Sequence, residues 1–188
     1  MPQSYTVLRV MHCGSLTSMK GVSLFSGLRQ LNLSSNSLLT MGNLEGMRGL
    51  EVLNLSCNKI TQISNLQPFA QTLRKLILSH NRILSLAVFN SGPHSAPMLA
   101  LEYLDLKDNY IGQLDEVKNL ESLVSLKELY FQNVNSTTNT LSNPVCDFEN
   151  YEEAVRLYLP NLAILDGREL FAGHPHLQKK ISISPLPN

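Results

Sequence analysis

The sequence predicts an α/β solenoid, a right-handed coil of about six repeats whose strands form one parallel, concave β-sheet. An apolar pattern, L-x-x-L-x-L-x-x-N-x-L, occurs four times in register along the 188-residue chain. Most copies start 22 or 23 residues apart, a period typical of stacked repeats that share one core. The chain is 43% hydrophobic, enough to fill such a core.

The pattern occurs in six segments of different quality. The close copies are LRQLNLSSNSL from Leu28, LEVLNLSCNKI from Leu50, LRKLILSHNRI from Leu73 and LEYLDLKDNYI from Leu101. Degraded copies start at Tyr5 and Leu126, and the six starting points are 23, 22, 23, 28 and 25 residues apart. The longest interval contains the segment SGPHSAP, residues 91–97, which predicts an inserted loop on the convex side.

Each copy predicts one short strand, because its leucines alternate with polar residues at the period of a strand. Stacked copies place neighbouring strands about 4.8 Å apart. The asparagine side chains are expected to turn inward and satisfy backbone groups where the chain leaves the strand. This structural ladder is predicted to consist of Asn36, Asn58, Asn81 and Asn109.

The segments between strands and the end of the chain predict the remaining elements. Short, irregularly apolar return segments favour 3₁₀ or single-turn pieces on the convex side. We assign residues 1–142 to the repeats, which stop at Pro144, and residues 143–171 to a C-terminal cap that closes the core. Helical spacing of apolar residues over 149–159 predicts the cap helix. Residues 172–188 are polar with three prolines and are expected to be a tail or linker.

Composition argues against several classes of function. Fifteen Lys plus Arg balance fifteen Asp plus Glu, so no general nucleic-acid or anionic-membrane surface is expected. No apolar run approaches the length of about 18 residues that a membrane span needs, and no signal peptide is recognisable. The three cysteines are far apart and odd in number, which is typical of reduced thiols in a cytoplasmic protein.

One row of outward side chains suggests chemistry. Cys57, His80 and Asp108 precede the asparagines of three consecutive repeats and could act as nucleophile, base and orienting acid. This row is expected to be solvent-exposed, whereas such catalysis needs an oxyanion hole and dry surroundings. We therefore predict no catalytic residue, no metal site, no cofactor and no small-molecule substrate.

Other rows of the concave face predict a protein-binding surface. Several outward positions carry aliphatic or aromatic side chains where small polar ones would suffice, and interface centres favour aromatic anchors beside basic residues. The outermost row alternates arginine and glutamate and is expected to form ion pairs of little energy each. The predicted partner-binding residues are Val52, Arg74, Lys75, Ile77, His80, Tyr103, Asp105, Lys107 and Tyr130.

The period and cap resemble the short intracellular leucine-rich-repeat subfamily. That group includes the phosphatase-1 regulatory repeat protein, the spliceosomal A-prime protein and the axonemal dynein light chain. Within it, the repeats from Leu50 and Leu101, the segment LESLVSLKELYF and the cap NPVCDFENYEEAVRLYLPNLAILDGRELF resemble the repeat domain of centrosomal leucine-rich repeat and coiled-coil proteins, over about residues 28–171. The resemblance implies a docking domain at centrioles or basal bodies and no catalytic residues.

We therefore expect a non-catalytic docking domain of a centriolar, basal-body or ciliary scaffold, which binds a centriolar, ciliary or cytoskeletal protein through the concave face. One alternative is a regulatory subunit that grips an enzyme such as type-1 protein phosphatase. That group has longer arrays with more acidic and aromatic concave residues. A thiol enzyme built on Cys57, His80 and Asp108 is a remote alternative, which requires a Cys57 thiolate that reacts readily with iodoacetamide.

Overall fold

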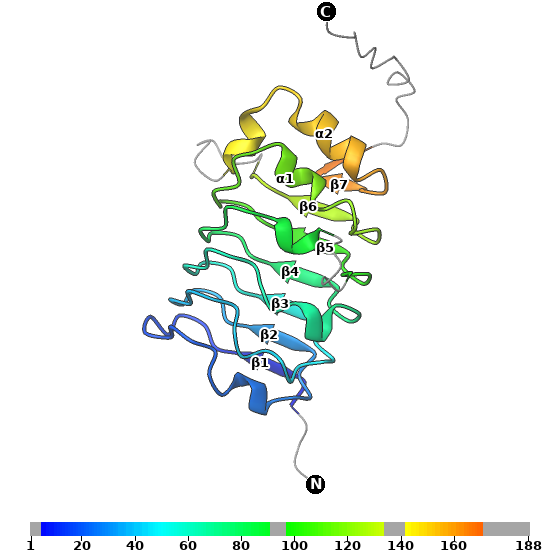
Figure 1. The fold of residues 1–188 in the computed structure, drawn as a ribbon. Coiled ribbons are helices and arrows are strands. Elements are labelled where there is room, and N and C mark those ends of the chain that lie inside the picture. The colour runs from blue at the N-terminus through cyan, green and yellow to red at the C-terminus, as the bar shows by residue number, and fades with distance from the viewer. Residues whose placement is uncertain (1–4, 91–96, 134–141, 171–188) are drawn as a thin grey trace, which may run out of the picture.

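The computed structural model describes residues 5–90, 97–133 and 142–170. In these residues eight strands form a single sheet, stacked in sequence order from β1 to β8 (Figure 1). Neighbours from β1 to β7 are parallel, and β8 turns back antiparallel on β7. The predicted parallel sheet with one strand per repeat is confirmed, with an antiparallel final strand that the sequence does not predict.

All elements of the solenoid are short. The strands are β1 (Val7–Arg9), β2 (Gln30–Asn32), β3 (Val52–Asn54), β4 (Lys75–Ile77), β5 (Tyr103–Asp105), β6 (Glu128–Tyr130), β7 (Ile164–Leu165) and β8 (Arg168–Glu169). The return segments contain the 3₁₀ turns η1 (Val22–Leu24), η2 (Gln67–Phe69) and η3 (Ala87–Phe89) and the single-turn helix α1 (Asp115–Lys118). After β6 come η5 (Pro144–Asp147) and helix α2 (Tyr151–Tyr158).

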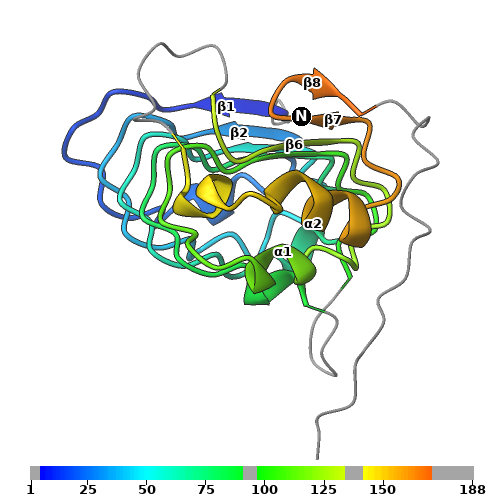
Figure 2. The same cartoon turned by 90° about the horizontal axis from the view of Figure 1, so that it is seen from above.

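The leucines of successive repeats stack into one continuous core. In the repeat that starts at Leu28, the side chains of Leu28, Leu31 and Leu33 are at most 1% exposed. Strand register places Leu31 beside Leu53, which in turn lies beside Leu76. Seen along the stack, the sheet forms one side of the molecule and α1 lies on the opposite side (Figure 2). The core therefore runs between the sheet and the return segments.

Each ladder asparagine joins two repeats. The Asn81 side-chain oxygen accepts a hydrogen bond from the Ile60 amide at 3.0 Å. Its Nδ2 donates to the carbonyls of Leu55 and Leu78, also at 3.0 Å. Asn36, Asn58 and Asn109 make the same set of bonds in their own repeats. These side chains replace the backbone partners that are lost where each strand ends.

The ladder continues past the last asparagine that the sequence identifies. Asn143 is fully buried, accepts a bond from the Ile111 amide at 3.0 Å and donates to the Phe131 carbonyl at 2.7 Å. Asp166 then takes the final position, where its Oδ1 accepts a bond from the Phe131 amide at 2.7 Å. Asn143, the residue before Pro144, thus makes the same kind of bonds as the four predicted ladder asparagines.

Helix α2 covers the C-terminal end of the core (Figure 1). It is shorter than the predicted helix over 149–159 and buries Tyr151 and Val155. The Tyr151 hydroxyl donates to Asp166 Oδ2 at 3.0 Å, and its ring meets the Phe131 ring edge-on at 6.0 Å. The cap is therefore attached to the last ladder position by both polar and aromatic contacts.

Two predicted segments lie outside the described residues: the insertion over 91–97, apart from Pro97, and the tail over 172–188. Among the described residues, no helix is long and apolar enough to cross a membrane.

Candidate protein-binding surface

The outward side chains of the strands and of the residues beside them form the concave face. The predicted binding residues all lie on it: Val52 on β3, Lys75 and Ile77 on β4, Tyr103 and Asp105 on β5, Tyr130 on β6, and Arg74, His80 and Lys107 within three residues of a strand. Strand register sets Lys75 beside Tyr103, and Asp105 lies between Ile77 and Tyr130. The repeat pattern thus brings residues far apart in sequence onto adjoining strands.

Four of these residues form a cluster of two tyrosines and two lysines. The rings of Tyr103 and Tyr130 are 5.3 Å apart between centroids, in a tilted arrangement. Lys75 Nζ lies 3.9 Å from the centre of the Tyr103 ring, and Lys107 Nζ lies 4.9 Å from that of Tyr130. Both distances suit cation–π attraction, which holds the ammonium groups over the rings. The tyrosine–lysine cluster is half-buried and preorganised, which lowers the ordering cost of binding.

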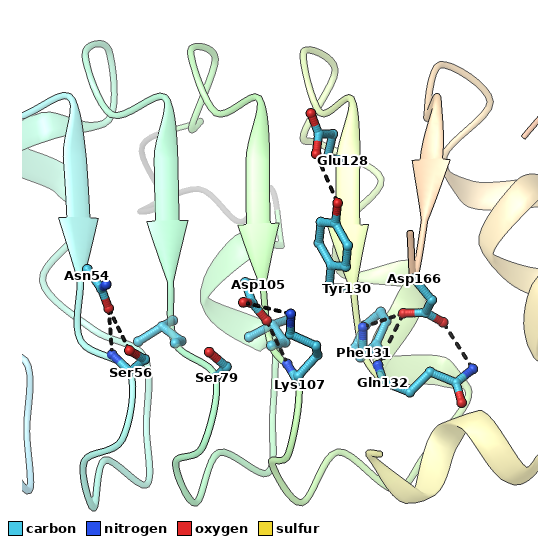
Figure 3. A network of polar contacts seen from close by, with 12 residues as sticks. Asn54, Ser56, Ser79, Asp105, Lys107, Glu128, Tyr130, Phe131, Gln132 and Asp166 are labelled. Carbon is cyan, nitrogen blue, oxygen red and sulfur yellow. Dashed lines mark hydrogen bonds and ion pairs between the residues drawn. The ribbon is translucent and has the colours of Figure 1, made fainter. Parts of the chain in front are cut away.

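Asp105 binds Lys107, one of the two lysines of this cluster. Its side chain is 7% exposed, its Oδ1 accepts a bond from the Lys107 amide at 3.1 Å, and its Oδ2 lies 3.3 Å from Lys107 Nζ (Figure 3). A partner can reach little of this carboxylate. Asp105 therefore fixes the position of Lys107, which is the more accessible of the two.

Both phenols are harder to ionise than an ordinary tyrosine, which is itself neutral at physiological pH. Burial raises the pKa of Tyr130 to about 12, with a further contribution from the hydrogen bond that the Tyr130 hydroxyl donates to Glu128 at 3.1 Å (Figure 3). Burial also raises the pKa of Tyr103 well above its ordinary value, and the Asp105 charge adds to the effect. The cluster thus presents two uncharged aromatic rings flanked by two ammonium groups.

The outermost row of the concave face forms ion pairs between neighbouring repeats. Arg29 pairs with Glu51, and Arg74 pairs with Glu102. The two arginine side chains are each 61% exposed, so solvent screens both pairs and each contributes little to stability. The main consequence of these ion pairs is that the positive charge of each arginine is already neutralised by a neighbouring carboxylate.

The row suggested as a catalytic triad is only partly assembled. His80 Nδ1 lies 2.7 Å from Asp108 Oδ2, so the predicted base and orienting acid do meet. The exposed Cys57 thiol makes no hydrogen bond to His80 among the described residues. No group of three or more His, Cys, Asp or Glu that could hold a metal ion occurs in that part of the chain.

The same row has a backbone role that the sequence does not reveal. Cys57, His80 and Asp108 have φ values of 54°, 57° and 50°, in the left-handed region. Among residues other than glycine, histidine and aspartate adopt this conformation several times more often than average. The turn out of each strand therefore accounts for a histidine and an aspartate at this position of the repeat.

Models of known protein families match two parts of the chain. Residues 26–68 match "Leucine Rich repeats (2 copies)" and residues 69–84 match "Leucine Rich repeat". Together with the stacked parallel sheet and the asparagine ladder, these matches define the chain as a leucine-rich-repeat solenoid. Leucine-rich repeats of this kind serve as protein-interaction domains.

Individual relatives extend this comparison. The chain is 39% identical over 67 residues to dynein axonemal assembly factor 11 of Mus musculus, a match that covers 36% of this chain and 12% of that protein. It is 35% identical over 101 residues to acidic leucine-rich nuclear phosphoprotein 32 family member A of Drosophila pseudoobscura pseudoobscura, covering 53% of this chain and 33% of that protein. The matches thus span a third or less of either relative's length.

A solved structure shows the same fold. An internalin (inlF) from Listeria monocytogenes superposes with a TM-score of 0.52 at 22% identity, covering 86% of this chain and 47% of that one. At this level of identity the likeness concerns the solenoid architecture alone.

Proposed function

We propose that this chain is a non-catalytic docking domain that binds another protein through its concave face, as part of a centriolar, basal-body or ciliary scaffold in the cytoplasm. The tyrosine–lysine cluster is the observation that carries the proposal. Paired aromatic rings beside cations, half-buried on the outward face of the sheet, have the composition of interface hot spots.

Two further observations support the location. The three cysteines are free, as expected for a protein in a reducing compartment. The similarity to a dynein axonemal assembly factor supports a ciliary connection. The match covers 12% of that relative, so it says nothing of that protein's partners. A partner in the cilium or centriole is therefore our proposal.

The proposal predicts which proteins the domain captures from a lysate of ciliated cells. Wild type and the double variant Tyr103→Ala/Tyr130→Ala are compared after crosslinking, with folding of both checked by circular dichroism. Tyr110→Ala is the matched control, because Tyr110 is an exposed tyrosine that does not belong to the cluster. The expected result is that centriolar, ciliary or cytoskeletal proteins are captured by wild type and by the control, and are lost from the double variant.

Two other outcomes would change the proposal. Capture that survives in the double variant would place the binding surface elsewhere than the tyrosine–lysine cluster. If type-1 protein phosphatase dominates the captured proteins, the domain is a regulatory subunit of that enzyme instead of a ciliary scaffold.

A further inference from the structure

The N-terminal half of the concave face contains a shallow hollow of about 150 Å³. Three aliphatic side chains, one each from β1, β3 and β4, give it an apolar floor. A cavity of about this volume accommodates a benzene molecule, so the hollow has room for one side chain of similar size. The concave hollow is lined by Val7, Arg9, Asn32, Val52, Asn54 and Ile77, among others.

The amides in the hollow offer donors to a ligand. Asn32 Oδ1 already accepts a bond from the Ser34 amide at 2.9 Å. Asn54 Oδ1 accepts bonds from the amide and hydroxyl of Ser56 at 2.9 and 2.8 Å (Figure 3). The Nδ2 groups of both asparagines have no acceptor among the described residues, so they are available to a ligand oxygen.

Two cations flank the hollow and lack a carboxylate partner within the described part of the chain. Arg9 lines the hollow on β1, and Lys75 flanks it on β4, beside Val52 in register, with its Nζ resting over the Tyr103 ring of the next strand. Strands β1 and β4 are three spacings apart, or about 14 Å. Arg29, Arg74 and Lys107 differ from them, because each already pairs with an acidic side chain. No carboxylate lines the hollow itself.

We propose that the concave hollow binds an acidic segment of the partner protein, an inference that rests on the docking function above. One apolar side chain of the segment packs between Val7, Val52 and Ile77. Carboxylates on both sides of that side chain pair with Arg9 and Lys75, and the asparagine Nδ2 groups donate to the segment's oxygens. The apolar floor between the two cations favours a peptide over a nucleic acid, whose phosphates would leave that floor uncovered.

The test is a selection of random displayed peptides on the full chain, followed by fluorescence anisotropy with the enriched peptides. These are expected to carry Asp or Glu on both sides of an aliphatic or aromatic residue. The double variant Arg9→Gln/Lys75→Met is expected to bind them about tenfold or more weakly. Lys59→Met, which removes an exposed lysine that does not line the hollow, is the matched control and is expected to bind like wild type.

Several results would overturn the acidic-segment assignment. These are enrichment of neutral or basic peptides, failure of the selection to enrich any sequence, affinity unchanged in Arg9→Gln/Lys75→Met, or tighter binding of a single-stranded oligonucleotide than of any peptide. The lysate capture with the Tyr103→Ala/Tyr130→Ala variant shows whether the acidic-segment assignment alone is wrong or whether the docking function is wrong as well. If capture depends on the two tyrosines while the selected peptides are not acidic, the docking function stands and the acidic partner is wrong.

Discussion

Asn81 illustrates what one side chain contributes to this solenoid. Its amide satisfies the buried Ile60 amide and two carbonyls of different repeats. Alanine at this position would leave the buried Ile60 amide without its partner, whereas the Leu55 and Leu78 carbonyls would keep one donor each, from Asn58 and Asn109. A buried backbone group without a partner costs about 1–3 kcal/mol. The ladder asparagines are therefore required by the backbone, independently of any binding function.

We expect Asn81→Ala to lower the free energy of unfolding by about 1–3 kcal/mol, since the buried Ile60 amide loses its partner and two carbonyls each lose one of two donors. Urea denaturation with an unchanged m-value measures the effect. Asn161→Ala, at an exposed asparagine, is the matched control and is expected to unfold like wild type. Equal stability of the two variants would contradict the role of the ladder.

A second prediction at the residue scale concerns the cysteines. Burial raises the pKa of the Cys146 thiol to about 12, with a contribution from the Asp166 charge, so the thiol stays protonated at pH 8. Only the thiolate is nucleophilic, and Cys13 and Cys57 are exposed. Peptide mass spectrometry after iodoacetamide treatment should show Cys146 modified much more slowly than the other two. Modification of Cys146 at the rate of Cys13 would contradict the buried environment.

At the scale of the element, helix α2 ends the solenoid by supplying a donor to the last ladder position. Asp166 accepts bonds from the Phe131 and Gln132 amides and from the Tyr151 hydroxyl. The buried carboxylate thus takes the place of the next repeat's asparagine. Tyr151 carries two functions in this element, because its ring also packs against Phe131.

Tyr151→Phe keeps the ring and removes the hydroxyl donor from Asp166. A hydrogen bond to a charged group contributes about 1.5–3 kcal/mol, and we expect the free energy of unfolding to fall by that amount. Tyr158→Phe, in the same helix, is the control, because its hydroxyl makes no hydrogen bond among the described residues. If both variants unfold at the same urea concentration, the cap does not depend on the Tyr151–Asp166 bond.

At the scale of the whole molecule, the two ends of the stack differ. The C-terminal end is covered by α2, whereas β1 is an edge strand that contains the exposed Val7 and is flanked by the exposed Tyr5 and Met11. In a solenoid each repeat contacts only its neighbours, so local stability follows how many sides of a repeat are covered. The N-terminal repeat is thus expected to open more readily than the centre.

Hydrogen exchange followed by mass spectrometry measures this difference. Amides of β4 and β5 are expected to exchange more slowly than those of β1, because opening the central strands requires disruption of two repeat interfaces. Peptides that contain β6 are expected to behave like the centre, since the cap covers them. Exchange of β1 as slow as that of β4 would show that the stack opens as one unit.

Much of the fold follows from the sequence because the repeat is periodic. The spacing of leucines and asparagines defines strand order, register and inward direction together, so it also defines which residues share a row of the concave face. Asn143 is missed because residues 134–141 separate it from its strand and break the spacing. Asp166 is missed because a carboxylate replaces the expected amide.

The site is less predictable than the fold, because it depends on side-chain packing across strands. Register places Lys75 beside Tyr103, but the position of the ammonium over the ring is a matter of rotamers. The near-complete burial of Asp105, between Ile77 and Tyr130 and against Lys107, likewise depends on how these side chains pack. The left-handed backbone conformation of Cys57, His80 and Asp108 results from the turn that follows each strand. The types of these residues alone do not indicate this conformation.

The central claim is that a protein partner docks on the concave face, and site-specific photocrosslinking tests it most directly. A benzophenone amino acid is placed at Val52, on the concave face, or at Leu84, an exposed leucine that is not on a strand. Each protein is then irradiated in lysate from ciliated cells. We predict that the partner is crosslinked from Val52 and not from Leu84. Crosslinks to the same protein from Leu84 alone would contradict the account, because the partner would then lie away from the concave face.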